Sequence, residues 1–448
     1  MNTAVLETEE TSIVADEPAA ALILGPEHHQ RPELAEWHRE LRSAAWQKFD
    51  GLPMPARTDE TWRFSSIKAL DLTPYNAPQP VSAAVREELI SRSKGLDAVA
   101  GRMIFGNDEL LTREVQSEAL RQKGVIWLPI EQAAVEHADL FRKHFMREEA
   151  VLGSRKFAAL HEAWVKNGTF LYIPRGVEIE LPIEAFHWLH GEGSSCFPHT
   201  LIIADENSKV TLVDYFASAD GSAPGFACGV NDLWVGAGAK VTYVNIQEWS
   251  TKTLAMQINS TIVGRDASAV ALTAHFGGET VRSESISHLR GQGGRSDMLA
   301  LSSVDAKREI DQRTLQIHEK PNTSSDLLYK NALDNQARTI FSGLIRVAPG
   351  AHFTDAYQKV RNLLLSDEAE ANSAPGLEIE ADNVRCTHGA TSGQIEEEEL
   401  FYLLSRGISK PVAQRLIVYG FLNEVIERLP NEAVQERLRS MLQKQFVA

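Results

Sequence analysis

Apolar residues change their spacing along this chain, and each change marks a different kind of structure. Near the start they recur every three or four residues, the spacing of one helical face, at Leu34, Trp37, Leu41 and Ala45. The same spacing returns later, at Phe157, Leu160, His161 and Trp164. It predicts a mainly helical N-terminal domain over residues 31–167.

From Thr169 onward, short apolar runs replace the helical spacing, and each run bends at a small or polar turn. Runs of this shape begin at Ile173, Ile203, Val235 and Val263, in steps of 30, 32 and 28 residues. Self-similarity near a fixed step is typical of a solenoid, whose units must stack to bury their apolar sides. An antiparallel β-sandwich also has short strands and frequent turns, so the spacing leaves both folds open.

Helical spacing returns near the end of the chain, where Leu400, Phe401 and Leu404 lie on one side of a predicted helix that ends at Gly407. Two more helical patterns follow, and Pro430 separates them. The predicted organisation is a disordered acidic tail over residues 1–30, the helical domain over 31–167, a strand-rich core over 168–393 and a helical module over 394–448.

The charge balance narrows the range of partners. The 448 residues include 61 acidic and 45 basic side chains, for a net charge of −16. A field of this sign repels phosphate backbones and anionic lipids, so we expect neither nucleic acid nor a membrane as a partner. The first thirty residues contain no Lys or Arg, unlike a signal or transit peptide. Three cysteines without a CxxC pair favour a reducing compartment, so we expect a cytoplasmic protein.

The sharpest candidate for chemistry is the pair Cys386 and His388. Alternate residues of a strand share a face, so the two side chains would project together from Cα atoms about 6.6 Å apart. A thiolate and an imidazole placed this way suit a soft metal. Iron or zinc normally takes four ligands, so the others would have to come from another chain. The simpler interpretation is a structural cysteine, because free Cys is usually buried.

Two other groups of residues suggest different functions. The first has an HxxH spacing followed by Cys and His, which resembles a zinc site but also fits satisfied packing roles; its members are His187, His190, Cys196 and His199. The second would suit a carbohydrate-active enzyme on a β-helix, whose sites use clustered carboxylates with basic residues; its members are Asp305, Arg308, Glu309, Asp311 and Arg313. The chain contains neither a GxxxxGK[ST] loop nor a GxSxG elbow.

Several longer runs are similar to one known family. They are Glu-Thr-Trp-Arg-Phe at 60–64, the run at 167–177, Thr-Asp-Ala-Tyr-Gln at 354–358, Pro-Gly-Leu-Glu-Ile at 375–379, Arg-Cys-Thr-His-Gly-Ala-Thr at 385–391, and the run at 400–408. Together they resemble the SufB/SufD family of the SUF system, which assembles iron–sulfur clusters, over most of residues 30–448. The run from Cys386 is similar to the SufD type. SufB-type chains carry a further Cys in the stretch that here reads Arg-Asn-Leu-Leu at 361–364.

The resemblance implies a right-handed parallel β-helix core between an N-terminal helical region and a C-terminal helical module. It implies a non-catalytic scaffold subunit that pairs with SufB and binds the SufC ATPase through the C-terminal module, in the region of Leu400, Phe401, Tyr402 and Arg406. Cys386 and His388 would lie at the interface with SufB, where a transient iron–sulfur cluster is assembled, with no cofactor held tightly by this chain alone. A SufB-like homodimeric scaffold, and a homodimer of the isolated chain, remain open alternatives.

Overall fold

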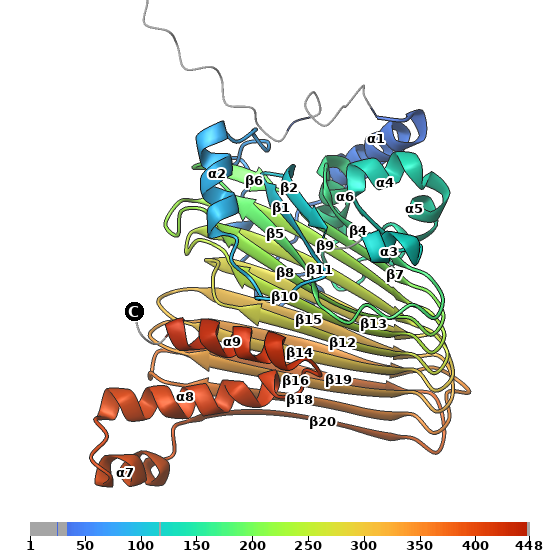
Figure 1. The fold of residues 1–448 in the computed structure, drawn as a ribbon. Helices are drawn as coiled ribbons and strands as arrows, with labels where there is room; N and C mark the ends of the chain where they lie inside the picture. Colours follow the sequence, from blue (N-terminus) through green and yellow to red (C-terminus); the bar gives the residue numbers. More distant parts are fainter. Residues whose placement is uncertain (1–24, 26–33, 116–117, 446–448) are drawn as a thin grey trace, which may run out of the picture.

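The computed structural model describes Gly25, residues 34–115 and residues 118–445. The predicted acidic tail over residues 1–30 lies, except for Gly25, outside this described part. Two ten-stranded sheets face each other (Figure 1) and run almost the whole length of the molecule. None of the described helices is both long enough and apolar enough to cross a lipid bilayer.

The two sheets are the walls of a parallel β-helix, because the chain passes from one sheet to the other after nearly every strand. Sheet A contains β4 (Gly168–Ile173), β7 (His199–Ala204), β9 (Gly225–Val235), β11 (Thr253–Val263), β13 (Thr280–Leu289), β15 (Glu309–His318), β17 (Arg338–Val347) and β19 (Glu370–Ile379). Sheet B contains β5 (Ile183–Leu189), β8 (Lys209–Ser218), β10 (Lys240–Glu248), β12 (Ser268–His275), β14 (Arg295–Val304), β16 (Ser324–Leu333), β18 (Asp355–Leu364) and β20 (Arg385–Gln394). One short strand, β6 (Ser194–Cys196), pairs beside β9.

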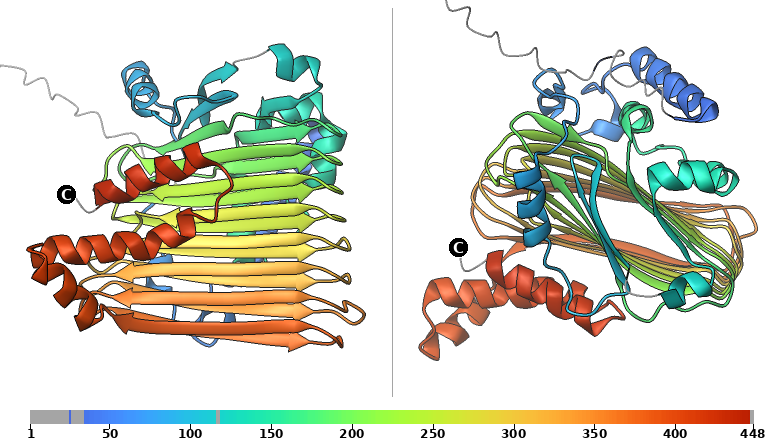
Figure 2. Two further views of the ribbon diagram at one scale, coloured as in Figure 1. Left: turned by 60° about the horizontal axis from the view of Figure 1, so that its bottom comes forward. Right: turned by 45° about the horizontal axis from the view of Figure 1, so that its top comes forward.

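The predicted repeat of about 30 residues is one coil of this β-helix. The bends that follow β7, β9 and β11 stack on one another (Figure 2), and their backbones are hydrogen-bonded from coil to coil. The amide N–H of Gly236 donates to the carbonyl of Ala204 at 2.7 Å, and that of Gly264 donates to Val235 at 2.8 Å. Because neighbouring strands of these coils run parallel, the sandwich alternative is wrong.

The N-terminal region is less purely helical than its spacing predicts. It also contributes β1 (Gly101–Gly106), β2 (Glu109–Val115) and β3 (Ile126–Pro129), which extend both sheets beyond the first coil. Its helices are α1 (Glu36–Gly51), α2 (Ala83–Arg92), α3 (Glu118–Gln122), α4 (Ile130–Glu136), α5 (Ala138–His144) and α6 (Arg155–Trp164), with 3₁₀ turns η1 (Glu60–Trp62) and η2 (Ile67–Leu70). The predicted domain boundaries, after residues 30, 167 and 393, stay predictions.

The C-terminal helices form an arm beside sheet B. They are α7 (Glu397–Ser405), α8 (Lys410–Ile426) and α9 (Glu432–Gln445). The second half of α8 and the apolar face of α9 are buried against the outer side of sheet B. The buried Lys330 of β16 fastens α8, because its ammonium group donates to the carbonyl of Phe421 at 2.9 Å and pairs with Glu424. In contrast, α7 has no buried residue.

The two ends of the β-helix differ. The N-terminal helices gather at the first coils, at the top of Figure 1, whereas β20 lies at the bottom. In the described part of the chain, β19 and β20 each pair with one neighbour only and end their sheets. We call this uncovered last coil, β19 and β20, the open end.

Candidate functional site

The open end carries both residues of the predicted Cys/His pair. On β20, Cys386 pairs in register with Ala356 of β18, and His388 pairs with Gln358. Ala356 and Gln358 are buried, because they point into the coil. Cys386 and His388 therefore lie on the inner face of the last coil, where the next coil would cover them if the β-helix continued.

The two side chains differ in how readily they could bind a metal. Cys386 is half-buried and packs against the small apolar cluster that includes Val347 and Ala356. This burial raises the pKa of its thiol, and the carboxylate of Asp355 raises it further, so the thiol is protonated at neutral pH and must lose a proton to bind a metal. His388 is exposed, and a neutral imidazole is a metal ligand near pH 7. His388 is the more available donor.

The facing strand completes the surface with small and apolar groups. Ser373, Pro375, Leu377 and Ile379 of β19 pair in register with inward-facing residues of β17, so they face the same space as His388. Ile379 is 42% exposed, although its position is one that earlier coils bury. The unpaired backbone groups along β19 and β20 add two edges that could pair with another chain. The open end therefore exposes inward-facing positions of the kind that earlier coils bury.

The predicted zinc-like group is dispersed by the fold. His187 lies inside the coil, stacked between Phe105 and Phe216, whereas His199 lies on the outer side of sheet A, where its Nδ1 is 3.0 Å from Nε2 of His161. Among the described residues, no three His, Cys, Asp or Glu side chains gather as a metal site. His187 and His199 belong to strands of different sheets, so the spacing of these histidines along the chain does not indicate a shared site.

The carboxylates that would suit a carbohydrate-active enzyme are paired with other side chains of this chain. Glu309 and Asp311 are buried beneath the segment around η2, where they accept hydrogen bonds from Ser66 and Ser65. Asp311 is also paired with Arg313 at 2.6 Å. Asp305 and Arg308 pair with each other at the turn before β15. The buried carboxylates of Glu309 and Asp311 already bind side chains of the same chain, which fits a structural role.

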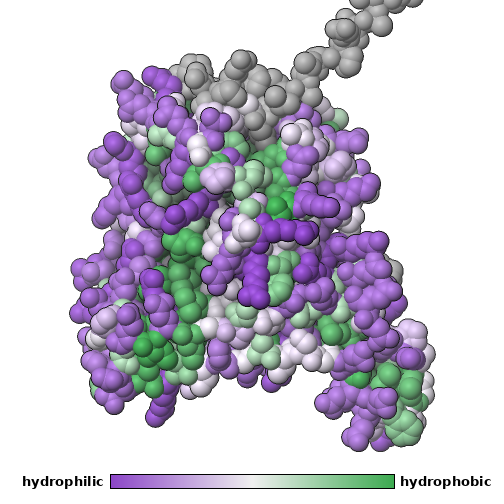
Figure 3. All heavy atoms as spheres, turned by 180° about the vertical axis from the view of Figure 1, so that it is seen from behind, coloured by the Kyte–Doolittle hydropathy of each residue, from purple (hydrophilic) through white to green (hydrophobic). Residues whose placement is uncertain are grey.

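Residues that the resemblance associates with SufC lie on the arm. Phe401 is 72% exposed and Tyr402 58% exposed, and Arg406 lies over the Tyr402 ring. Leu400 is partly buried. Hydrophobic residues show on the surface of the arm at the lower right of Figure 3. None of these four residues is buried in the described chain.

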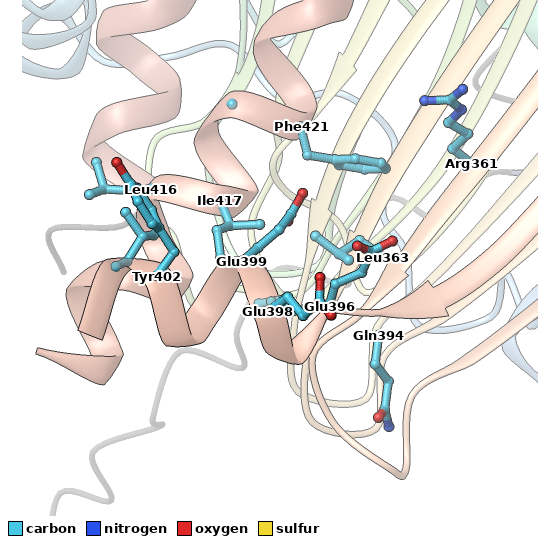
Figure 4. Close-up of a pocket in the computed structure, with 13 residues that line it drawn as sticks. Arg361, Leu363, Gln394, Glu396, Glu398, Glu399, Tyr402, Leu416, Ile417 and Phe421 are labelled. Carbon is cyan, nitrogen blue, oxygen red and sulfur yellow. The ribbon is translucent and has the colours of Figure 1, made fainter. Parts of the chain in front are cut away.

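Beside them is a cleft of about 820 Å³ between α7, α8 and the outer side of β18 (Figure 4). Apolar groups of Leu363, Leu416 and Phe421 line it, and carboxylates of Glu396, Glu398 and Glu399 lie at its α7 side. The sequence pattern indicated the helix but not this cleft, because the cleft needs β18, whose position relative to α7 the spacing does not fix.

Comparison with known proteins decides the family. The family model described as "SUF system FeS cluster assembly, SufBD core domain" matches residues 187–421, and the "SufBD protein N-terminal region" matches residues 29–185. The chain belongs to the SufBD family. Its open end is formed within the SufBD core domain, and the first half of the arm also lies within that match.

Curated relatives of this SufBD family member cover nearly its whole length. The iron–sulfur cluster assembly protein SufD of Bacillus subtilis (strain 168) is 31% identical over 427 residues, which are 93% of this chain and 95% of the relative. An iron–sulfur cluster assembly SufBD family protein of Staphylococcus epidermidis (strain ATCC 12228) is 26% identical over 442 residues, 96% of this chain and 94% of the relative. The chain is therefore a SufD-like member of an iron–sulfur cluster assembly family.

Proposed function

We propose that this SufBD family member is a non-catalytic scaffold subunit of a cluster-assembly complex. A SufB-type partner covers the open end, and the SufC ATPase binds the arm formed by α7 and α8. The observation that carries this proposal is the last coil, which turns His388 and Cys386 toward a space that no described part of the chain fills.

The incomplete donor set supports a partner at this surface. One imidazole and one half-buried thiol do not complete the four ligands that an iron site normally takes. A partner strand docked on the open end would pair with the free backbone edges, cover Leu377 and Ile379, and bring further ligands to the two donors. The cluster is cargo in this scheme. A site divided between two chains loses half of its ligands when the chains separate, which suits a cluster that must be handed on.

In this proposal the chain contributes two donor groups, the imidazole of His388 and the thiol of Cys386. His388 offers an exposed imidazole nitrogen as a donor. Cys386 contributes only after its thiol has lost a proton, since burial holds the pKa of that thiol above its ordinary value. Movement of SufC on the arm would be transmitted through α8, which the ion pair of Lys330 with Glu424 fastens to β16, and would open or close the covered end as a domain-scale switch.

Replacement of His388 tests this proposal. The chain is co-expressed with SufB-type and SufC-type partners, and iron and sulfide bound to the purified complex are measured under anaerobic conditions. We expect His388→Ala to assemble at least tenfold less cluster, because loss of even the hydrogen-bond partner of a metal ligand typically costs about 10–100-fold. The complex and its melting temperature should stay unchanged. Thr387→Ala is the matched control, because Thr387 is exposed on the opposite face of the same strand.

The same preparations separate the alternatives. If no stable complex with a SufB-type chain forms, the proposed partnership is wrong. A full cluster reconstituted on the isolated chain would instead support a homodimeric scaffold. Normal assembly by the His388→Ala complex would remove this imidazole from the site.

A further inference from the structure

A buried primary amide lies beside His388, on the neighbouring strand. Gln358 of β18 is in register with His388 of β20, and both point into the coil. Gln358 is only 2% exposed, yet neither its Nε2 nor its Oε1 has a hydrogen-bond partner among the described residues. An unpaired buried polar group costs about 1–3 kcal/mol, so a native side chain in this state needs an explanation.

The facing sheet leaves room for this amide. Gly343 of β17 has no side chain, and a Cβ atom there would lie 2.1 Å from Nε2 of Gln358. The same Cβ position is 2.5 Å from Oγ1 of Thr314 on β15, and that hydroxyl is also buried without a partner in the described chain. Gln358 therefore reaches across the coil into a gap that it shares with a second unpaired polar group.

Packing alone does not call for an amide at this place. Leu327 of β16 is the next residue inward in the same row, in register with Gln358, and it is fully buried. Leucine has nearly the volume of glutamine and would avoid the cost of the unpaired amide. The row therefore has an apolar residue at β16 but an amide at β18, the strand next to the exposed imidazole of His388.

We propose that Gln358 is a positioning residue for His388. When a partner covers the open end, the Gln358 carbonyl accepts a hydrogen bond from the ring N–H of His388 that does not bind metal, while Nε2 donates to Thr314. A ligating histidine commonly has its second nitrogen held in this way, which fixes its tautomer and orientation. This inference rests on the proposed function, because it assigns Gln358 a role at the same site.

Gln358→Leu tests the inference in the assembled complex. We expect about tenfold less cluster in a protein that melts at the same temperature or higher, since an apolar side chain of similar shape removes an unsatisfied amide. A merely structural role would instead lower the melting temperature. Gln247→Leu is the matched control. Gln247 of β10 is buried, and neither of its amide atoms has a hydrogen-bond partner in the described chain. It lies far from the open end, so its replacement should leave cluster assembly normal.

A double-mutant cycle with His388→Ala completes the test. If Gln358 acts through His388, Gln358→Leu will reduce assembly in the parent complex and will add nothing in the His388→Ala background. An equal further loss in both backgrounds, or normal assembly by Gln358→Leu, overturns the inference. Impaired assembly by His388→Ala together with normal assembly by Gln358→Leu rejects only the role of Gln358, whereas normal assembly by His388→Ala rejects the proposed site as well.

Discussion

Buried charge fixes the segment around η1 on the outer side of sheet A. Arg282 is 2% exposed and pairs with Glu284 at 2.7 Å and with Asp311 at 2.6 Å. It also donates to the carbonyls of Thr61 and Leu152, and its guanidinium lies 3.7 Å from the ring centroid of Trp62. One side chain therefore joins two strands to segments more than 100 residues earlier in the chain.

Removing this cation should strongly destabilise the fold. Arg282→Met keeps much of the side-chain volume but leaves the carboxylate of Glu284 buried without its cation, and Asp311 with Arg313 alone. Breaking a buried pair in this way costs about 3–5 kcal/mol. The free energy of urea unfolding measures the effect. Arg295→Met is the control: Arg295 is half exposed and pairs with Asp297, so its loss should change stability by less than about 1 kcal/mol. Equal effects of the two variants would contradict the argument.

The sequence predicts which residues share a face wherever the spacing within one strand or helix decides it. Cys386 and His388 could be placed on one face because the strand period is two. Gln358 and Gly343 could not be linked to His388, because their proximity comes from the register of three strands separated in sequence. The network of Arg282 was likewise not predictable, since Trp62 and Arg282 meet although they lie 220 residues apart in the sequence. The spacing of residues within a strand thus predicts which side chains share a face. Which of these faces come into contact depends on how the coils stack, and the sequence does not show that.

At the scale of single elements, the sequence predicted the coils of the β-helix and the helices of the arm from different signals. The coil repeat was visible because each coil has its own bend, such as the one after Val235, and the helix ends at Gly407 and Pro430 were visible because these residues interrupt helices. The strands β1, β2 and β3 were missed, since they are short and lie among helices. The helix α7 was predicted, but only the structure shows that none of its residues is buried in the described chain.

The exposed side of α7 gives a prediction about the ATPase. Aromatic side chains that become buried at an interface often carry 2 kcal/mol or more of binding energy. We therefore expect Phe401→Asp to weaken binding of SufC by about 30-fold or more while the chain stays folded. Val135→Asp is the control, because Val135 is 66% exposed on α4, away from the arm. Titration calorimetry of the two variants checks this, and equal affinities would mean that α7 does not contact SufC.

For the whole molecule, the polar interior of the β-helix governs its response to acid. His275 and His318 lie inside the coil, and burial lowers the pKa of each to about 4 from the ordinary 6.5. Between these values the unfolded chain binds more protons than the folded chain, so stability must fall as pH falls from 6.5 toward 4. Each histidine accounts for about 3 kcal/mol of this loss.

His275→Gln should therefore flatten the pH dependence of stability while the parent chain loses stability steeply in this range. The glutamine cannot take up a proton when the chain unfolds, so one of the buried histidines no longer drives acid unfolding. The free energy of urea unfolding, measured at intervals from pH 7 to pH 4, gives the slope for each variant. His352→Gln is the control, since His352 lies at a surface turn where its Nδ1 contacts the carbonyl of Asp382. If His275→Gln and the parent chain lost stability with the same slope, the buried histidines would not be the groups that take up protons, and acid unfolding would have to begin at the surface.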